Sequence, residues 1–503
     1  MRLLFLFLIL LGSVHHSIAD HFTDKKTKTD ANLTGHVINK NTGEHIPFFT
    51  VSLKGTTLGT ATDETGHYFL KNLPVGSYTI RVNGVGYRSA EKQIVLRQGE
   101  TRELNFEVEE DIIQLETVVI SANKNETNRM EAPVVVHVMT PKLFENTNSV
   151  CLAQGLSFQP GLRVETNCQN CGFQQVRING LDGPYTQLLL DGKALFSSLN
   201  GVYGIEQIPA GMIERVEVMR GGGSALYGAN AIGGTVNIIT KEPLNNLFMI
   251  SHNLIAIGNS AYDNTTSLNA SLINGQRNAG LYIFGTSRHR QHYDHDGDHF
   301  SEIGELELTT LGFRSYYKPS SQTKLTLEYH NIQEFRRGGN LFSLPPHETD
   351  ITEQADHDIN GGGVDFSFFS KDYTHKFSLY SSVQHTDRQS YYGAGKDPNA
   401  YGKTKDLTAI AGIQYSYNFN RLLFMPAILT AGSEYSYNKL VDKMLGYHRT
   451  IDQKVDVYSF FLQNEWKTEQ FSFLLGGRLD KNSFIDHIIF SPRINLRYNP
   501  LKA

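Results

Sequence analysis

The sequence predicts a mainly β protein in three consecutive parts: a small β-sandwich, a mixed α/β part and a long series of antiparallel strands. Turns follow one another closely between residues 33 and 82, which is typical of a sandwich. A glycine-rich strand pair occupies residues 212–241, where glycines permit backbone angles that are closed to other residues. From residue 245 onward apolar and polar residues alternate, as in residues 324–330, and this period of two predicts strands with one apolar face.

The composition excludes some classes of protein. The chain has 503 residues and a formal net charge of −5, so it lacks the basic character of a nucleic-acid-binding protein and we expect no nucleic-acid partner. Hydrophobic residues make up 40% of the chain and the mean hydropathy is −0.32. These values fit a soluble protein, and they fit a transmembrane barrel equally well because only alternate residues of a barrel face lipid. The sequence contains no nucleophile–base set, so we expect no enzyme.

Residues 1–19 predict a secretory signal peptide. Arg2 gives the positive start, Leu3 to Leu11 form the apolar segment, and residues 17–19 (Ser-Ile-Ala) form a small-residue cleavage site. The alternative is an N-terminal anchor helix, but the apolar segment is short for a helix that spans a bilayer. The chain is therefore predicted to be exported.

Residues 31–110 are predicted to form the sandwich. Strands are expected at residues 33–38, 48–53 and 78–82, with a polar turn that closes on Gly66. This pattern is similar to the carboxypeptidase regulatory-like domain, a transthyretin-like β-sandwich. The region shows no zinc-ligand set, so the resemblance implies a spacer or interaction module and not an enzyme.

A short apolar segment follows the sandwich at residues 111–122. It is extended and lies next to a polar stretch, so it can add to the sheet edge of a partner. The alternative is that it forms the last strand of the sandwich. The segment resembles the TonB box of TonB-dependent outer-membrane receptors, usually written Leu-Asp/Glu-x-Val-Val-Val-Thr-Ala. The residues that this resemblance assigns to TonB coupling are Leu115, Glu116, Thr117, Val118, Val119 and Ile120.

Residues 130–241 carry several motifs in one order. Residues 159–165 read Gln-Pro-Gly-Leu-Arg-Val-Glu, residues 187–192 read Gln-Leu-Leu-Leu-Asp-Gly, and the glycine-rich strand pair comes last. Together they resemble the plug domain of TonB-dependent receptors. The plug-motif residues are Glu217, Arg220, Gly221, Tyr227, Gly228, Gly233 and Gly234.

Two of these residues carry charge, Glu217 and Arg220. We expect them to form charged contacts between the plug and the barrel wall, because a charge inside a barrel needs a partner. The alternative is a solvated strand edge.

Residues 242–503 are predicted to form strands of an antiparallel transmembrane β-barrel. A soluble sandwich also alternates, but the resemblance of the preceding region to a plug favours a barrel. The 503 − 241 = 262 residues after the plug suffice for roughly 10–12 strands at about 10 residues each. Plugged outer-membrane transporters have about 22 strands. We therefore expect the front half of a barrel only, through a fragment, a split gene or a frameshift, because open sheet edges in lipid are costly.

Cys168 and Cys171 form a C-x-x-C motif within the plug region. Such a motif can indicate redox activity, a metal site or a disulfide. A disulfide is favoured outside the cytoplasm, and contact of this loop with ligand is the alternative. Cys151 remains, either buried or paired with one of the other two cysteines.

A possible calcium site lies in the His/Asp-rich segment 288–302. Asp294, Asp296, Asp298 and Glu302 are spaced like part of a calcium loop, but Gly297 is not at the glycine position of an EF-hand. The alternatives are a transition-metal site that uses the neighbouring histidines and a solvated extracellular loop. We expect no other cofactor.

The family resemblance implies energy-coupled import across the outer membrane of a Gram-negative bacterium. The ligand binds from outside, and TonB with its inner-membrane energising complex engages the TonB box and rearranges the plug. The implied ligand is a small metal chelate or macrocycle of the ferric siderophore, haem or cobalamin class, and the other partner is outer-membrane lipid. Two alternatives stay open: a glycan importer paired with a surface lipoprotein, and a truncated product that does not transport.

Overall fold

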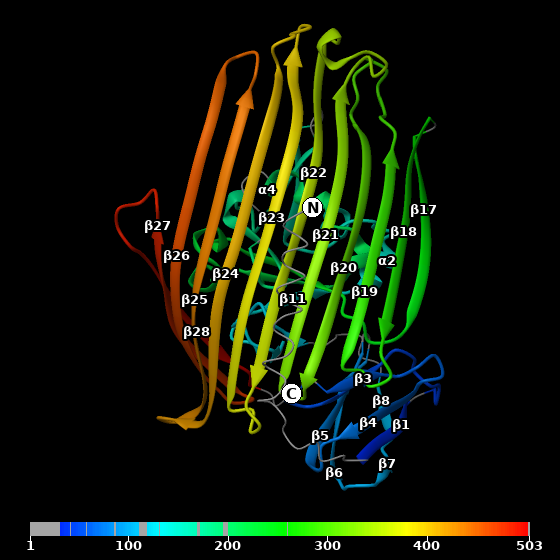
Figure 1. The fold of residues 1–503 in the computed structure, drawn as a ribbon, viewed down its shortest axis with the longest axis vertical. Coiled ribbons are helices and arrows are strands. Elements are labelled where there is room, and N and C mark those ends of the chain that lie inside the picture. The colour runs from blue at the N-terminus through cyan, green and yellow to red at the C-terminus, as the bar shows by residue number, and fades with distance from the viewer. Residues whose placement is uncertain are drawn as a thin grey trace, which may run out of the picture. The chain divides into compact units, whose positions relative to one another are not determined.

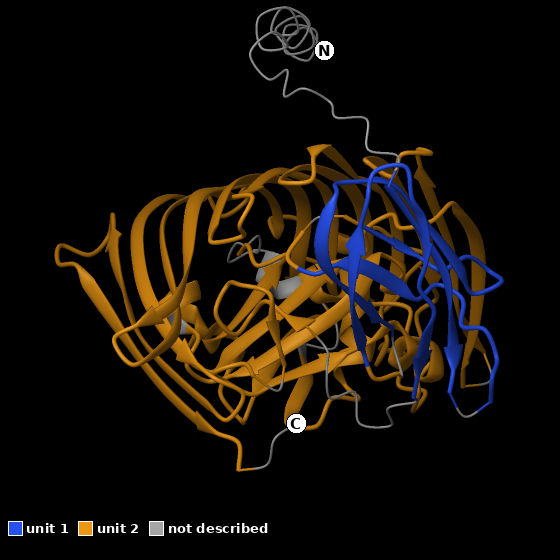
Figure 2. Ribbon diagram, turned by 90° about the horizontal axis from the view of Figure 1, so that it is seen from below, with its two compact units in different colours: residues 1–54, 59–84, 89–110 blue, residues 55–58, 85–88, 111–503 orange. Residues whose placement is uncertain are grey.

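A computed structural model of the chain is dominated by strands (Figure 1). It describes residues 31–40, 42–56, 58–84, 87–109, 118–129, 131–168, 172–194, 200–258 and 260–500. The predicted signal peptide and the coupling residues Leu115, Glu116 and Thr117 lie outside these ranges. None of the helices in these ranges is long and apolar enough to cross a bilayer. The chain divides into two compact units, shown in two colours in Figure 2.

The first unit is a β-sandwich, as the turn pattern predicts. In one sheet β1 (Ala31–Asn39) lies between β4 (His67–Leu73) and β7 (Thr101–Glu103), and β8 (Phe106–Val108) pairs farther along β1. The other sheet has the order β3 (Gly59–Ala61), β2 (Thr50–Leu53), β5 (Gly76–Asn83) and β6 (Ala90–Leu96). Alternate apolar residues of these strands are buried and fill the space between the sheets; they include Leu33, Val37, Val51, Ile80, Val82 and Phe106.

Three histidines meet on the surface of this sandwich. His36 on β1 pairs directly with His67 on β4, and His45 lies beside both. The ring centroids are 4.7 to 5.7 Å apart. Burial, followed by the neighbouring rings, lowers the pKa of His36. No motif in the sequence predicts this group, because its members come from three separated segments with no recognisable ligand spacing.

The second unit begins with a plug domain built on a four-stranded sheet. The sheet order is β11 (Val136–Met139), β15 (Ile213–Arg220), β16 (Gly234–Thr240) and β14 (Thr186–Leu190). A separate hairpin joins β12 (Leu162–Cys168) and β13 (Phe173–Ile178). Helices α2 (Pro141–Asn146), α3 (Leu152–Leu156) and α4 (Asn200–Gln207) belong to the same domain. One apolar core joins the helices to the sheet.

Close backbone neighbours leave no room for a side chain at the glycine pair Gly233-Gly234. Gly234 has a φ of +142°, and a Cβ atom at this position would lie 2.2 Å from the carbonyl oxygen of Met219 on β15. The backbone N–H of Gly233 donates to the carbonyl of Tyr185 at 2.8 Å. The glycines therefore allow β15, β16 and the segment before β14 to approach closely.

The wall of the second unit is one 12-stranded antiparallel sheet in which every strand pairs with its neighbour in the chain. This number agrees with the count expected from the sequence. Among the described residues β17 and β28 are the two ends of the sheet. The strands are β17 (Leu247–Ile257), β18 (Ala261–Ile273), β19 (Ala279–Arg290), β20 (Glu305–Ser320), β21 (Thr323–Gly339), β22 (Ile351–Phe369), β23 (His375–Ala394), β24 (Tyr401–Leu422), β25 (Met425–Met444), β26 (Arg449–Lys467), β27 (Phe471–Asn482) and β28 (Ile489–Tyr498).

The two faces of this sheet have inverted polarity compared with a soluble protein. On β24 the polar residues Thr404 and Asp406 are buried, whereas Ile413 and Tyr415, on the other face, are exposed. Figure 2 shows the plug elements on the concave side of the sheet, and the buried polar residues face them. An apolar outer face with a polar inner face is the pattern of a transmembrane barrel wall. The predicted fold class is therefore confirmed.

The two ends of the wall differ in their connections. Strands are joined at one end by longer segments, such as residues 291–304 and 340–350, and at the other end by tight turns, such as residues 321–322 and 423–424. Outer-membrane barrels have long loops on the extracellular side and short turns on the periplasmic side. The long-loop end is thus assigned to the outside.

Candidate functional site

The carboxylate of Glu217 holds the end of the predicted TonB box. Glu217 lies on β15 and is fully buried. Its Oε2 accepts hydrogen bonds from the backbone N–H groups of Ile120 and Ser121, both at 2.9 Å, and from the Ser121 hydroxyl at 2.7 Å. Its Oε1 accepts a hydrogen bond from Arg215 at 2.8 Å. A buried carboxylate with this many donors is well compensated, so the contact can fix the segment to the central part of the plug sheet.

The plug-motif residue Tyr227 and Asn237 of β16 lie next to the same contact. The hydroxyl of Tyr227 donates to the carbonyl of Ser121 at 3.3 Å, and the amide of Asn237 on β16 donates to the Ser121 hydroxyl at 3.0 Å. Val119 is fully buried and belongs to the same apolar cluster as Tyr227. We call residues 118–127, from β9 (Val118–Val119) to the start of β10 (Thr127–Asn128), the coupling segment.

The middle of the coupling segment is bonded to the barrel wall. The amide of Asn123 donates to Glu465 on β26 at 2.6 Å. The amide of Asn125 donates to the Thr430 hydroxyl on β25 at 2.8 Å. The segment therefore connects the plug sheet with wall strands that lie about three hundred residues later in the chain.

Lys124 lies at the centre of this connection, and only 9% of its side chain is exposed. Its ammonium group is 3.7 Å from Glu434 on β25, and it lies over the rings of Phe461 and Tyr227 at 4.5 and 5.2 Å from their centroids. Burial lowers the pKa of Lys124, although Glu434 opposes this effect. A buried ammonium requires such partners because its desolvation is costly.

Glu217 and Arg220 do not make the expected charged contacts with the wall. Within the described ranges, the partners of Glu217 are plug and coupling-segment groups, and Arg220 donates to the carbonyl of Pro160 in the plug. The expectation failed because β15 lies inside the plug sheet, between β11 and β16, where its side chains meet the coupling segment first.

One set of plug–wall ion pairs is formed around the Asp-Gly turn after β14. Lys193 is buried, with its ammonium 2.8 Å from Asp365 on β22 and 3.1 Å from Glu328 on β21. Asp191 forms an ion pair with Arg314 on β20. Burial alone would lower the pKa of Lys193, but the surrounding carboxylates raise it. The sequence motif identified this turn without indicating what it contacts.

A second set is centred on Glu206 in α4. Its carboxylate is 2.8 Å from Arg290, 3.2 Å from Arg288 and 3.4 Å from Arg336, all three on wall strands. Burial would raise the pKa of Glu206, but the three guanidinium groups outweigh it and lower the pKa to about 2. The negative charge is therefore retained inside the wall. No sequence motif marked Glu206.

The cysteines are only partly described. Cys151 is free and buried, and its sulfur is 3.9 Å from a guanidinium nitrogen of Arg288. Burial raises the pKa of the Cys151 thiol. The side chain of Cys168 and the whole of Cys171 lie outside the described residues, so their pairing stays a prediction.

The predicted calcium ligands lie together in the loop between β19 and β20. Asp294, Asp296, Asp298 and Glu302 each place one oxygen within 4.8 Å of the others. The backbone N–H of Gly297 donates to Asp294 at 2.7 Å and is the main cause that lowers the pKa of Asp294. Carboxylate oxygens are ligands that Ca²⁺ prefers. Calcium binding itself stays a prediction.

Comparison with known proteins assigns the family. Residues 246–503 match the family described as TonB dependent receptor-like, beta-barrel. The chain belongs to the TonB-dependent receptor family. Residues 128–235 match the TonB-dependent receptor plug domain, and residues 33–120 match the CarboxypepD_reg-like domain. This TonB-dependent receptor is accordingly an outer-membrane protein of a Gram-negative bacterium.

Individual relatives agree with this membership. The vitamin B12 transporter BtuB of Vibrio vulnificus (strain CMCP6) is 35% identical over 127 residues, which cover 25% of this chain and 21% of BtuB. The crystal structure of the siderophore receptor PirA from Acinetobacter baumannii is similar with a TM-score of 0.61 and 18% identity, over 73% of this chain and 59% of PirA. FpvA of P. aeruginosa, bound to heterologous pyoverdines, gives a TM-score of 0.60 and 14% identity, over 78% of this chain and 60% of FpvA. The matched part thus spans about a fifth of BtuB and about three fifths of the solved receptors.

Replacement of Glu217 by alanine is expected to release the coupling segment. The N–H groups of Ile120 and Ser121 lose their acceptor, and hydrogen bonds to charged groups contribute about 1.5–3 kcal/mol each. We expect amide hydrogen exchange of residues 118–122 to accelerate by at least about tenfold. Glu214→Ala, at an exposed position of the same strand, is the control. Equal exchange in both variants contradicts the role of Glu217.

Acid is expected to loosen α4 from the wall. The pKa of Glu206 is lowered to about 2. The ion pairs of its carboxylate therefore contribute fully to stability above about pH 4.5, and this contribution is lost as the pH falls toward 2. Glu206→Gln is expected to remove this pH dependence and to weaken the contact already at pH 7, since a broken buried pair costs about 3–5 kcal/mol. The measurement is hydrogen exchange of residues 200–207, corrected for intrinsic rates, at pH 7 and pH 3. Glu145→Gln, at an exposed position in α2, should behave like the wild type; if Glu206→Gln does so as well, the pairs do not hold α4.

Calcium is expected to bind the loop weakly, with a Kd of roughly 10⁻⁴–10⁻³ M, as is common in extracellular modules. Isothermal titration should detect the binding in the wild type. Asp296→Asn should weaken it by about tenfold because one anionic ligand is lost. Asp486→Asn, in a different exposed loop, should leave it unchanged. Absence of calcium-dependent heat in the wild type removes the predicted site.

Proposed function

We propose that this receptor imports a small ligand across the outer membrane and that TonB drives the import through the coupling segment. The observation that carries the proposal is the contact of Glu217 with Ile120 and Ser121. It joins the end of the predicted TonB box to the plug sheet by hydrogen bonds that can break and form again.

The position of Glu217 indicates how a pull on residues 115–120 reaches the plug. β15 pairs with β11 on one side and β16 on the other, so force applied at Glu217 acts on the middle of the sheet. β16 pairs in turn with β14, which leads into the turn that carries Asp191 and Lys193. A displacement of this sheet has to exchange the pairs of Lys193 with Glu328 and Asp365 for water or new partners.

Ion pairs, and not only apolar contacts, hold the plug against the wall. Such an interface suits a domain that has to move. The pairs at Lys193 and Glu206 are buried, so separating them costs several kcal/mol each. Spontaneous opening is therefore rare, and an energy source is required. Inner-membrane energy delivered by TonB would supply it.

The proposed ligand is a metal chelate or macrocycle of the ferric siderophore, haem or cobalamin class. Two kinds of relative support this class: one is named a vitamin B12 transporter and the others include siderophore receptors. The N-terminal CarboxypepD_reg-like domain favours a second candidate, import of glycans together with a surface lipoprotein.

The test is ligand uptake by cells that produce the full chain, with and without TonB. We expect TonB-dependent uptake of a ferric siderophore, haem or cobalamin, reduced by about tenfold or more in Glu217→Gln because charged hydrogen bonds are lost, with equal ligand binding to whole cells. Glu214→Gln is the matched control. Uptake that persists without TonB contradicts the proposal, whereas TonB-dependent growth on a glycan with no uptake of the three ligand classes supports the second candidate.

A further inference from the structure

Three histidine side chains lie together on the face of the first sandwich sheet that points away from the apolar core. His36 on β1 is directly opposite His67 on β4, so these two side chains leave the sheet side by side. The chain turns back after β1, and His45 forms an antiparallel bridge with Ile38 next to them. The ring centroids of the three pairs are 4.9, 5.7 and 4.7 Å apart. We call these three residues the histidine trio.

The spacing of the trio fits three imidazoles that share one metal ion. Zinc–nitrogen bonds of about 2.0–2.1 Å in a tetrahedral site place the ring centroids about 5 Å apart. The three observed separations lie on either side of this value. Among the described residues only the carboxylates of the loop between β19 and β20 already hold their ligand atoms within 4.8 Å of one another, so metal binding by the trio requires rotation of the rings. His45 and His67 are exposed and have the space for it.

The backbone that carries the trio is fixed by the fold of the sandwich. The N–H of Ile46 donates to the carbonyl of Val37 at 2.8 Å, and the N–H of Val37 donates to the carbonyl of Gly66 at 3.0 Å. Gly66 has a φ of +77°, and a Cβ atom at this position would lie 2.7 Å from the Cβ of His45. Glycine thus allows the segment with His45 to pack closely against the turn before β4. A site on such a frame is preorganised, because folding has already brought its segments together.

Hydrogen bonds orient the ring of His67 in the manner of a metal-ligating histidine. Its Nδ1 is 3.1 Å from the carbonyl oxygen and 3.0 Å from the hydroxyl oxygen of Thr65. The Thr65 hydroxyl donates its single proton to Asp63 at 2.6 Å, so both oxygens of Thr65 can only accept from the ring. Nδ1 therefore carries the proton, and Nε2 keeps the lone pair that a metal ion needs. Metal-ligating histidines commonly donate their second ring N–H to a backbone carbonyl in this way.

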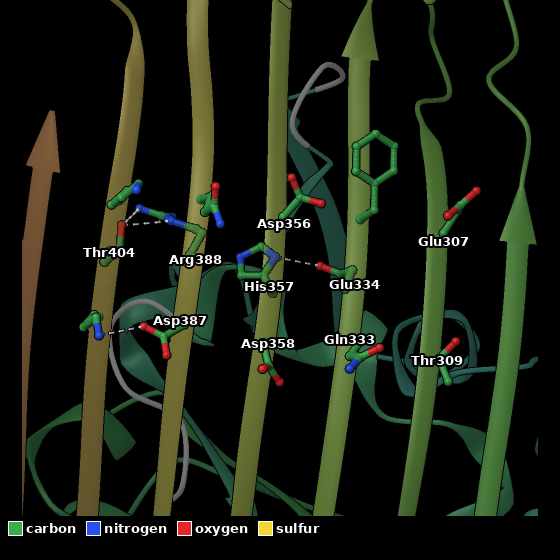
Figure 3. Close-up of a pocket in the computed structure, with 14 residues that line it drawn as sticks. Glu307, Thr309, Gln333, Glu334, Asp356, His357, Asp358, Asp387, Arg388 and Thr404 are labelled. Carbon is green, nitrogen blue, oxygen red and sulfur yellow. Dashed lines mark hydrogen bonds and ion pairs between the residues drawn. The ribbon is translucent and has the colours of Figure 1, made fainter. Parts of the chain in front are cut away.

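The cavity in the wall shows a different arrangement (Figure 3). It has a volume of about 610 Å³, and among the described residues that line it His357 is the only histidine. The Nδ1 of His357 is 3.2 Å from a carboxylate oxygen of Glu334. One imidazole that already faces a carboxylate does not supply the set of nitrogens found in the trio. The sandwich is therefore the place where several imidazoles can share one ion.

We propose that the histidine trio binds one divalent transition-metal ion, such as Zn²⁺, through one nitrogen of each ring, with water in the remaining position. Imidazole suits zinc, copper and nickel, whereas calcium and magnesium take oxygen ligands. The bound ion joins β1, β4 and the segment that carries His45, and so it favours the folded sandwich. The inference does not depend on the import function, because it uses residues of the first unit only.

The test is equilibrium dialysis of the purified full chain in non-ionic detergent micelles against Zn²⁺. The triple variant His36→Gln/His45→Gln/His67→Gln should bind one equivalent of Zn²⁺ less than the wild type. His67→Gln alone should weaken this equivalent by at least about tenfold, since one of three nitrogen ligands is lost. The matched control is His292→Gln/His295→Gln, in the exposed loop between β19 and β20, which should keep the equivalent.

A second measurement uses the wild type, where folding of a variant plays no part. Zn²⁺ at about 100 times its Kd should slow amide hydrogen exchange of residues 43–47 and 63–67 by at least about tenfold. Unchanged exchange in both segments shows that no ion is held between them and overturns the proposal. Equal Zn²⁺ binding by the triple variant and the wild type, or loss of the equivalent in the loop variant instead, places the metal elsewhere. Displacement of Zn²⁺ by Ca²⁺ at comparable concentration indicates an oxygen site and contradicts ligation by imidazole.

Discussion

A charge that is enclosed by a barrel wall needs a partner, and this constraint organises the second unit. Two plug elements that approach the wall bring an ion for which the wall supplies the opposite charge: Glu206 faces three arginines, and Lys193 faces two carboxylates. The coupling segment obeys the same rule, with Lys124 next to Glu434. These pairs fix the position of the plug, yet they consist of contacts that can be exchanged singly. Apolar packing alone would also hold the domain, but its contacts could not be exchanged one at a time.

One alternating pattern gives the wall an apolar face toward lipid and a polar face toward the plug. Side chains such as Ile413 and Tyr415 face outward, and Thr404 and Asp406, on the same strand, face the plug. A shift of one residue in register would exchange the two sets completely. The continuous pairing of each strand with its chain neighbour is therefore as important to the chemistry of the interior as any single ion pair.

Local patterns made the sandwich, the plug strands and the number of wall strands predictable from the sequence, because alternation and turn residues act over a few positions. Partners could not be predicted. Ser121 lies 96 residues before Glu217, and nothing in either segment specifies that they meet. The expectation that Glu217 faces the wall failed for this reason. Glu206 carries no motif at all, and the His36–His67 contact depends on how β1 and β4 are paired.

The sequential pairing of the wall also makes its strand contacts local. Each strand pairs only with its neighbours in the chain, so the contacts between strands span short stretches of sequence. The coupling segment is different, since Asn123 meets Glu465 across 342 residues. Its partners on β25 and β26 are available only when these two strands have formed. The coupling segment therefore reaches its observed contacts only after β25 and β26 are in place, which ties its position to strands more than three hundred residues later in the chain.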